Sequence, residues 1–328
     1  MRSRIVVGAV LFMALCEGWG KGDGDEWERL VLDGAAHENA GNYVSAAASF
    51  RDAVHMAEQP GAPELRLPSS LNALARAHEE LGDFAEAERL FIRAVAILEK
   101  IGYTDSLTHA VLLSNLGSLY VEEGQIVKGE ALLRQSLAIK TRLLPAEDEQ
   151  IAITCNVLAE ALIKEEKHRE AEQLLDRARA ILEKKPQPTR ALAVTLNSFG
   201  VIRRNQGRNQ EAARLIERAI EILEGETGPD HPILLCALNN LATLYALSRR
   251  RDDADKTFQR ALLVAQKHAG TNHPMYGAVL ANYAAFLRMI GRKAESKTVQ
   301  AQSNEVLRDS ARRNGVGMTV DASALRYK

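Results

Sequence analysis

The chain contains 328 residues, of which 46% are hydrophobic and only 5% aromatic, and its 42 Lys and Arg residues nearly balance 43 Asp and Glu residues. This length is enough for two or three ordinary domains, or for one repeat array that needs no single large core. The apolar content excludes disorder as the general state of the chain. A net charge of −1 argues against a dedicated nucleic-acid-binding protein, which would carry a basic excess.

The N-terminus differs in composition from the rest of the chain. Arg2 and Arg4 precede an uninterrupted apolar run of twelve residues, 5–16. A membrane span needs about 18 apolar residues, whereas a run of about 7–15 fits the central region of a secretory signal. We therefore expect residues 1–20 to be a signal peptide, residues 21–26 to be a linker, and the mature protein to be periplasmic or secreted, without a membrane span.

Two alternatives to a cleaved signal peptide remain open for this segment. Cys16 could carry a lipid anchor, but Leu15 stands where a bacterial lipobox has a small residue. The apolar run could also be a buried N-terminal helix, although two arginines at the very start are more typical of a signal.

A helix-turn-helix block recurs along the rest of the chain. A turn residue, usually Gly, repeats every 41 or 42 residues, a small residue follows five positions later, and a large apolar residue follows four after that. Gly or Ala also stands seven positions before each turn, where it lets the two helices approach closely. The turns are at Gly41, Gly82, Gly124, Glu166, Gly207, Arg249 and Gly291, the small residues at Ala46, Ala87, Gly129, Ala171, Ala212, Ala254 and Ser296, and the large ones at Phe50, Phe91, Leu133, Leu175, Ile216 and Phe258, with Gln300 as the exception.

The pattern predicts an array. Apolar residues recur at helical spacing within each block, so each hairpin has apolar surface that only a neighbouring hairpin can cover. In the seventh block Ser296, Gln300 and Ser303 stand where apolar residues would face an eighth, which predicts a solvent-facing end. We expect the array to span residues 27–311 and a tail to span residues 312–328.

These blocks resemble the tetratricopeptide repeat, whose units are helix-turn-helix hairpins of about 34 residues. Two features resemble the kinesin-light-chain type of this repeat, which is also widespread in bacterial proteins. The blocks are about 42 residues long, and the stretches GPDHP at 228–232 and GTNHP at 270–274 precede the helical segments LNNLA and LANYA. The resemblance implies an all-α fold, a right-handed α-superhelix (solenoid) of about seven repeats. In the GPDHP stretch we expect Asp or Asn to supply the helix cap and Pro to occupy the first turn.

Catalytic and metal-binding signatures are missing from the sequence. No Walker, zinc-protease, Cys-x-x-Cys or nucleophile-elbow motif occurs, so we expect no enzyme activity and no cofactor. His231 and His273 each stand alone beside a Pro, which favours capping turns over metal ligation. Cys155 and Cys236 fall two repeats apart, too far for a disulfide, and we expect both to be buried as small apolar residues.

In this repeat class the first helices line a concave groove, and asparagine is concentrated there. Asn is unfavourable inside helices, so its recurrence needs a reason. The amides either tie neighbouring hairpins together or grip the backbone of an extended peptide, and both can hold. The residues concerned are Asn72, Asn115, Asn156, Asn197, Asn239, Asn240 and Asn282.

Charged side chains beside the amides change along the array. The first half offers Arg76 among several glutamates and the second offers Lys164, Arg204 and Arg288, which gives either a polarised groove or a set of merely solvated charges. The sequence therefore predicts a non-enzymatic scaffold that binds a protein or peptide in the groove, with no nucleic acid as partner. The alternatives are an accessory or regulatory subunit of an enzyme or secretion complex, and a small-molecule sensor.

Overall fold

The computed structural model describes residues 26–268 and 271–314. Residues 1–20, to which the signal-peptide prediction applies, lie outside the described residues together with Cys16. Most of the predicted linker and tail lie outside them as well. None of the helices in the two described ranges is both long enough and apolar enough to cross a membrane.

The described residues form seven helical hairpins and contain no β-strand, so the predicted all-α solenoid class is confirmed. The hairpins are α2 (Glu26–Asn39) with α3 (Tyr43–Ala57), α4 (Arg66–Glu80) with α5 (Phe84–Lys100), α6 (Leu107–Glu122) with α7 (Ile126–Leu143), α8 (Glu149–Lys164) with α9 (His168–Leu182), α10 (Arg190–Asn205) with α11 (Asn209–Thr227), α12 (Leu235–Leu247) with α13 (Arg251–His268), and α14 (Pro274–Met289) with α15 (Lys293–Asn314). A short 3₁₀ helix, η1 (Pro232–Leu234), precedes α12. Within the described residues, helical structure extends from Glu26 to Asn314 and so includes three residues beyond the predicted end of the array.

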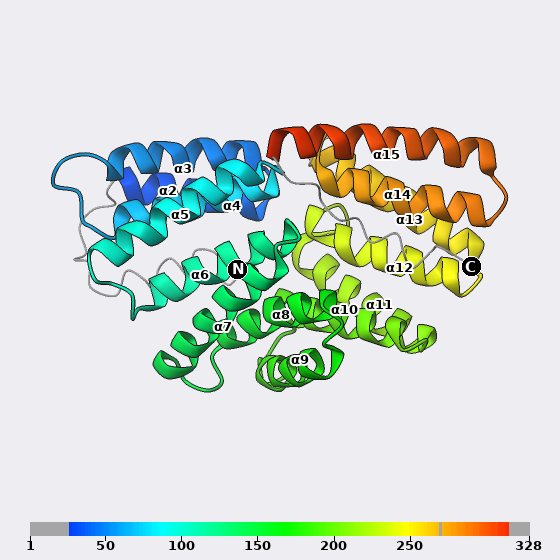
Figure 1. Ribbon diagram of the computed structural model, residues 1–328, viewed down its shortest axis with the longest axis horizontal. Coiled ribbons are helices and arrows are strands. Elements are labelled where there is room, and N and C mark those ends of the chain that lie inside the picture. Colours follow the sequence, from blue (N-terminus) through cyan, green and yellow to red (C-terminus); the bar gives the residue numbers. More distant parts are fainter. Residues whose placement is uncertain (1–25, 269–270, 315–328) are drawn as a thin grey trace. The chain divides into compact units, whose positions relative to one another are not determined.

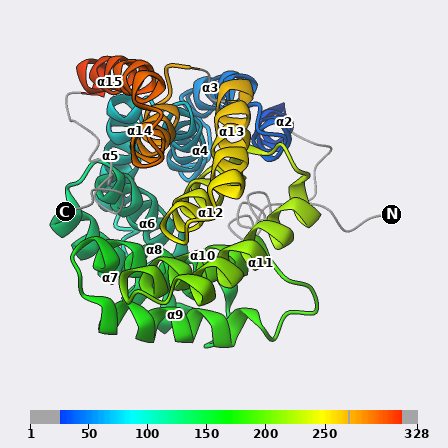
Figure 2. The same cartoon turned by 90° about the vertical axis from the view of Figure 1, so that its right-hand side faces the viewer.

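The helices group into two compact units, which we describe separately. Unit 1 includes α2–α5 and most of α6 and α7. It contains α6 up to Leu119 and α7 over Ala131–Leu143. Unit 2 includes the connecting segment Tyr120–Glu130 and α8–α15. In unit 1 the α2–α3 and α4–α5 hairpins pack side by side (Figure 1). In unit 2 each first helix packs on its own second helix, as α10 and α11 do in Figure 2, and α8, α10, α12 and α14 follow one another in contact.

The predicted turn positions share one backbone conformation. All seven have a positive φ between 60° and 89°. Five of them are Gly, for which this region costs nothing, whereas Glu166 and Arg249 adopt it with a side chain, which costs roughly 1–2 kcal/mol. The 41- or 42-residue spacing therefore reflects a repeated left-handed turn between the two helices of each hairpin.

Close contact between the two helices of a hairpin explains the small residue before each turn. A Cβ atom added to Gly34 would lie 2.5 Å from Cε1 of Phe50, and one added to Gly200 would lie 2.5 Å from Cγ1 of Ile216. Phe50 and Ile216 are the predicted large apolar residues of their blocks, and each is 1% exposed. The prediction that small residues permit close approach is confirmed.

The seventh hairpin differs from its prediction. Ser296 and Ser303 do not face solvent: they are 7% and 0% exposed. The Ser303 hydroxyl donates to the Gly277 carbonyl at 2.8 Å, and the Ser296 hydroxyl donates to the Ala284 carbonyl at 2.8 Å. Ser136, at the same repeat position as Ser303, makes the same bond to the Ala110 carbonyl. The hydroxyls satisfy backbone acceptors of the first helix, so these serines are part of the hairpin core.

From the third hairpin onward, the first helices share a side-chain capping position, which α4 lacks at Leu65. The side chain at this position accepts a hydrogen bond from a backbone N–H two or three residues later, in helices α6, α8 and α10 and at the starts of η1 and α14. The caps are Ser106, Asp148, Thr189, His231 and His273. The expectation that Asp or Asn would cap the helix after 228–232 was wrong, because the histidine next to Pro232 takes that role. Both histidines stand in capping turns, as expected.

Candidate functional site

Asparagine side chains bridge neighbouring first helices in both units. In unit 1 the Asn115 amide donates to Oδ1 of Asn72 at 2.8 Å. In unit 2 the Asn240 amide donates to Oδ1 of Asn197, and the Asn282 amide donates to Oδ1 of Asn239, each at 3.1 Å. Each pair spans 43 residues, one more than the usual repeat, so the donor stands one position later in its block than the acceptor.

Asn156 departs from this pattern. It is 2% exposed, donates to the Ala191 carbonyl at 2.9 Å and accepts from the Thr195 hydroxyl at 2.9 Å. The next block has Ser198 at the donor position, so no second amide completes the pair. Asn156 therefore joins α8 to α10 from within the core, and its carboxamide is not presented to solvent.

The paired asparagines of unit 2 retain hydrogen-bonding capacity. A carboxamide offers two N–H donors and two acceptor lone pairs. Each inter-helix bond uses one N–H of the donor asparagine and one lone pair of the acceptor asparagine. Asn197, Asn239 and Asn240 are partly exposed, whereas Asn282 is 6% exposed. We call Asn197, Asn239, Asn240 and Asn282 the amide ladder of unit 2. It links α10, α12 and α14, and its first three amides also face solvent.

Cys236 lies at the amide ladder and differs from its prediction. Cys155 is buried as expected, but Cys236 is exposed. Its Sγ is 3.9 Å from Nδ2 of Asn197 and 3.8 Å from Nδ2 of Asn240. The surrounding protein limits hydration of the thiolate and, with the negative charge of Glu160, raises the pKa of the Cys236 thiol to about 11. The thiol is thus accessible but weakly acidic.

The predicted basic residues occupy different settings. In unit 1, Arg76 Nη2 binds Glu38 Oε1 at 2.5 Å, and this carboxylate raises the pKa of Arg76 despite desolvation. In unit 2, Lys164 donates to the Val121 carbonyl at 3.1 Å and lies 3.4 Å from Glu160.

The two predicted arginines further along unit 2 lie near the ends of their helices. Arg204 donates to Asn205 at 3.4 Å, and Arg288 is exposed near the end of α14. Of the predicted basic groups, Arg76 and Lys164 thus join neighbouring repeats, and Lys164 and Arg288 are exposed.

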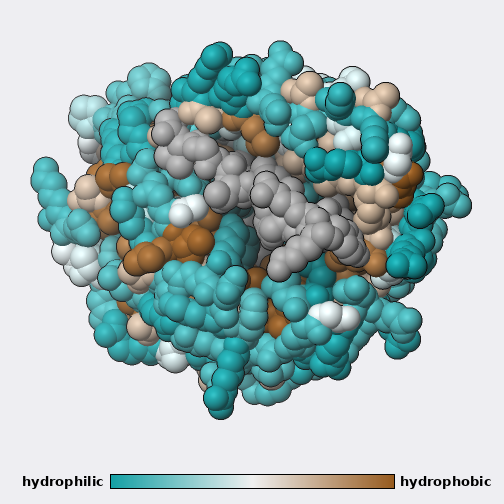
Figure 3. Space-filling view, turned by 45° about the vertical axis from the view of Figure 1, so that its right-hand side comes forward, coloured by the Kyte–Doolittle hydropathy of each residue, from teal (hydrophilic) through white to brown (hydrophobic). Residues whose placement is uncertain are grey.

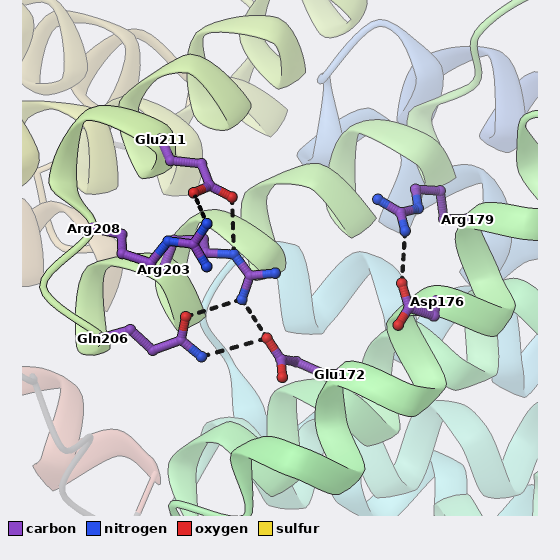
Figure 4. A network of polar contacts seen from close by, with 7 residues as sticks. All are labelled: Glu172, Asp176, Arg179, Arg203, Gln206, Arg208 and Glu211. Carbon is purple, nitrogen blue, oxygen red and sulfur yellow. Dashed lines mark hydrogen bonds and ion pairs between the residues drawn. The ribbon is translucent and has the colours of Figure 1, made fainter.

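A second polar cluster, which the sequence did not indicate, lies where α9, α10 and α11 meet (Figure 4). Arg203 binds Glu172 of the preceding hairpin and lies 3.0 Å, through Nε, from Glu211 of its own hairpin. Gln206 accepts from Arg203 at 3.0 Å, and Arg208 completes the cluster on Glu211. Similar ion pairs join other hairpins across 35–38 residues, including Arg93 with Glu58, Arg260 with Glu224 and Arg292 with Asp255. These contacts are explained by repeat packing alone.

The surface shows few further features. Figure 3 shows a mainly hydrophilic face interrupted by separate hydrophobic patches. Among the large apolar side chains that are exposed, Val44, Val127 and Leu263 are 72%, 76% and 67% exposed, and Val194 of α10 is 40% exposed. Within 26–268 and 271–314, no three His, Cys, Asp or Glu side chains converge as metal ligands would.

Stacked helical hairpins of this size, with side chains bridging neighbouring first helices, define an α-solenoid repeat protein. Models of the tetratricopeptide repeat match residues 69–101, 108–184, 191–262 and 234–309. These ranges cover more than half of the chain, which therefore belongs to the tetratricopeptide repeat family.

Individual relatives agree with this assignment. Protein KINESIN LIGHT CHAIN-RELATED 3 of Arabidopsis thaliana is 28% identical over 153 residues, which is 46% of this chain and 23% of the relative. The chain thus spans about a quarter of that curated relative. Two solved structures share the fold. A Rap protein complexed with Competence and Sporulation Factor matches with TM-score 0.62 and 16% identity over 94% of this chain and 86% of its own. The Rap conjugation gene regulator of plasmid pLS20, in complex with the Phr* peptide, matches with TM-score 0.68 and 14% identity. The match covers 92% of this chain and 84% of the regulator.

Proposed function

We propose that the chain is a non-enzymatic scaffold that binds an extended peptide or protein segment along the first helices of unit 2. The observation that carries the proposal is the amide ladder, in which Asn197, Asn239 and Asn240 hold neighbouring helices together and still face solvent. A peptide backbone needs a donor and an acceptor at each residue, and a carboxamide supplies both.

The repeat spacing suits an extended ligand. Packed helices lie about 8–10 Å apart, and an extended chain advances about 3.3 Å per residue. Successive rungs of the ladder would therefore meet about every third peptide bond. The Rap regulator that shares this fold was solved with the Phr* peptide, which supports a peptide as the ligand class. With 5% aromatic residues, the chain has little material for an enclosed small-molecule pocket.

Val194 allows this surface to be tested without touching the ladder. It lies three residues before Asn197, on the same face of α10, and is 40% exposed. Val194→Glu places a charge beside the amides, and Leu263→Glu on the second helix α13 is the matched control because Leu263 is 67% exposed. A displayed library of random peptides is the probe.

We expect the wild-type protein to enrich extended peptides, Leu263→Glu to retain them, and Val194→Glu to lose them with unchanged melting temperature. Asn156→Ala should lower stability and leave peptide binding intact, because this amide is buried. Failure to enrich any peptide, or equal binding by the two glutamate variants, would contradict the proposal.

We also propose that the chain is exported. The support is the sequence of residues 1–20, with Arg2 and Arg4 before the apolar run.

A further inference from the structure

The capping residues of the first helices change in chemistry along the array. They recur at intervals of 41 or 42 residues, at Ser106, Asp148, Thr189, His231 and His273. The first three cap with hydroxyl or carboxyl oxygens, which retain lone pairs over the whole neutral and mildly acidic range. The last two cap with an imidazole nitrogen, which does not.

The two histidine caps have the same geometry. Nδ1 of His231 accepts from the backbone N–H of Ile233 at 3.2 Å, and Nδ1 of His273 accepts from that of Met275 at 3.0 Å. Their backbone angles are φ −70°, ψ 138° and φ −73°, ψ 136°, and each is followed by Pro at the first helical position. Because Nδ1 is an acceptor in both, the capping form of the imidazole is neutral.

Protonation acts on these caps in two ways. A proton on Nδ1 removes the lone pair that accepts the backbone N–H, so the hydrogen bond is lost. It also places a positive charge at the positive end of the helix dipole, which is unfavourable. In the unfolded chain an imidazole titrates near pH 6.5, so below this pH the unfolded chain binds protons that the intact caps exclude, and the folded state loses stability.

Charged groups surround the two caps from the elements packed against them. Next to His231, Asp230 binds Lys267 of α13 at 2.8 Å, and Arg260 of α13 binds Glu224 of α11 and donates to the Pro229 carbonyl. Next to His273, Arg313 of α15 donates to the Asn272 carbonyl at 2.7 Å. Helices α12 and α14 themselves contain no Asp or Glu. The carboxylates of Asp230 and Glu224 near His231 already bind cations, and Arg313 lies beside the residue that precedes the His273 cap.

We infer that the sixth and seventh repeats contain an acid-sensitive switch, in which protonation of His231 and His273 releases the N-terminal caps of η1–α12 and of α14. The switch selects these repeats because the earlier caps, at Ser106, Asp148 and Thr189, keep their acceptors. Helices α12 and α14 carry Asn239, Asn240 and Asn282, so loosening them in acid also loosens the amide ladder.

The test compares three forms of the full chain by thermal unfolding at about pH 8 and about pH 5.5, on either side of the imidazole titration. His231→Asn/His273→Asn keeps both caps, since Asn is a good N-cap and does not titrate. His231→Ala/His273→Ala removes both caps at every pH. Titration of all other groups is common to the three proteins and cancels in the differences between them.

At the higher pH we expect the wild-type protein and the Asn variant to have the same melting temperature. At the lower pH the wild-type melting temperature should lie roughly 4–8 °C below that of the Asn variant and approach that of the Ala variant. A difference between wild type and the Asn variant that is the same at both pH values would overturn the inference. If the Ala variant does not fold, the comparison of wild type with the Asn variant still decides. The assay contains no peptide, so its result is independent of the proposed function.

Discussion

The side-chain amide of Asn240 on α12 donates to Oδ1 of Asn197 on α10 at 3.1 Å, across 43 residues of sequence. The adjacent residue Asn239 accepts the corresponding bond from Asn282 on α14. Helix α12 is therefore tied through consecutive asparagines to the first helix on either side, which gives mid-helix asparagine a structural role in addition to the proposed binding role.

The Asn197–Asn240 bond should be measurable as a coupling. We expect Asn240→Ala and Asn197→Ala each to lower the free energy of unfolding by about 0.5–1.5 kcal/mol, because each leaves its partner without this bond on a partly exposed surface. The double variant should cost less than the sum of the two. Urea unfolding of the four proteins measures the coupling energy, and strictly additive losses would show that the bond contributes nothing.

Two glycine substitutions should act in opposite directions. Gly200→Ala puts a Cβ 2.5 Å from Cγ1 and 2.8 Å from Cδ1 of Ile216, so we expect a loss of about 1–3 kcal/mol. Gly225→Ala on α11 meets nothing within 4 Å and should gain roughly 0.5–1 kcal/mol from helix propensity. Chemical denaturation tests both. In an Ile216→Ala background the penalty of Gly200→Ala should shrink to the cost of the remaining contact with the Ala212 carbonyl oxygen at 3.3 Å. An unchanged penalty there would rule out the clash with Ile216.

The left-handed turn at Glu166 should be improved by glycine. Glu166 has φ 61°, whereas the equivalent Gly207 has φ 76°. We expect Glu166→Gly to raise the free energy of unfolding by about 0.5–1 kcal/mol. This is the difference between the backbone strain that glycine relieves and the extra conformational entropy that glycine gives the unfolded chain. Gly207→Ala, the reciprocal change, should lower it. Calorimetry of the two variants checks the sign, and destabilisation by Glu166→Gly would show that the side chain contributes more than the backbone strain costs.

Alkylation of Cys236 should depend steeply on pH. With its pKa raised to about 11 by desolvation, the thiolate is scarce at neutral pH, and the rate should rise about tenfold per pH unit between about pH 8 and 10. An ordinary thiol, with a pKa near 8.5, would level off above about pH 9. Mass spectrometry of peptides after iodoacetamide pulses measures this rate, and buried Cys155 should stay unmodified in the folded protein. A rate that levels off near pH 9 would contradict the raised pKa.

Export predicts a shorter mature chain. The protein isolated from its native host should begin near Lys21 and be recovered outside the cytoplasm, because signal peptidase removes residues 1–20. Intact-mass measurement distinguishes this from the two alternatives. Retention of Met1 in the folded cellular protein would argue against a signal, and a diacylated Cys16 would indicate a lipoprotein.

The repeat pattern was predictable because its constraints are local. A left-handed turn favours Gly at positions such as Gly207, and the close approach of two helices requires a small residue such as Gly200. Each constraint acts within one block, so it recurs at a fixed interval and is visible in one sequence.

The details of the candidate site could not be predicted from the sequence, because they depend on which face of each helix is exposed to solvent. Helix α12 is apolar around most of its circumference, so composition did not distinguish Cys236, which is exposed, from buried Leu238. Asp230 and His231 both precede Pro232, and only the backbone angles decide which side chain reaches the N–H of Ile233. Ser303 suits either solvent or a hairpin core, because a hydroxyl can donate to a helix carbonyl as it does to Gly277.

The side-chain bonds between neighbouring hairpins have a consequence for how the chain is made. They join residues 28–43 apart, from Tyr245 with Glu217 to Asn240 with Asn197. Such partners become available as soon as one further hairpin has been synthesised, and contacts of short sequence separation favour fast folding. Each repeat can therefore dock on its predecessor while the next is still being translated, so the array can assemble from the N-terminal side in the order of its synthesis.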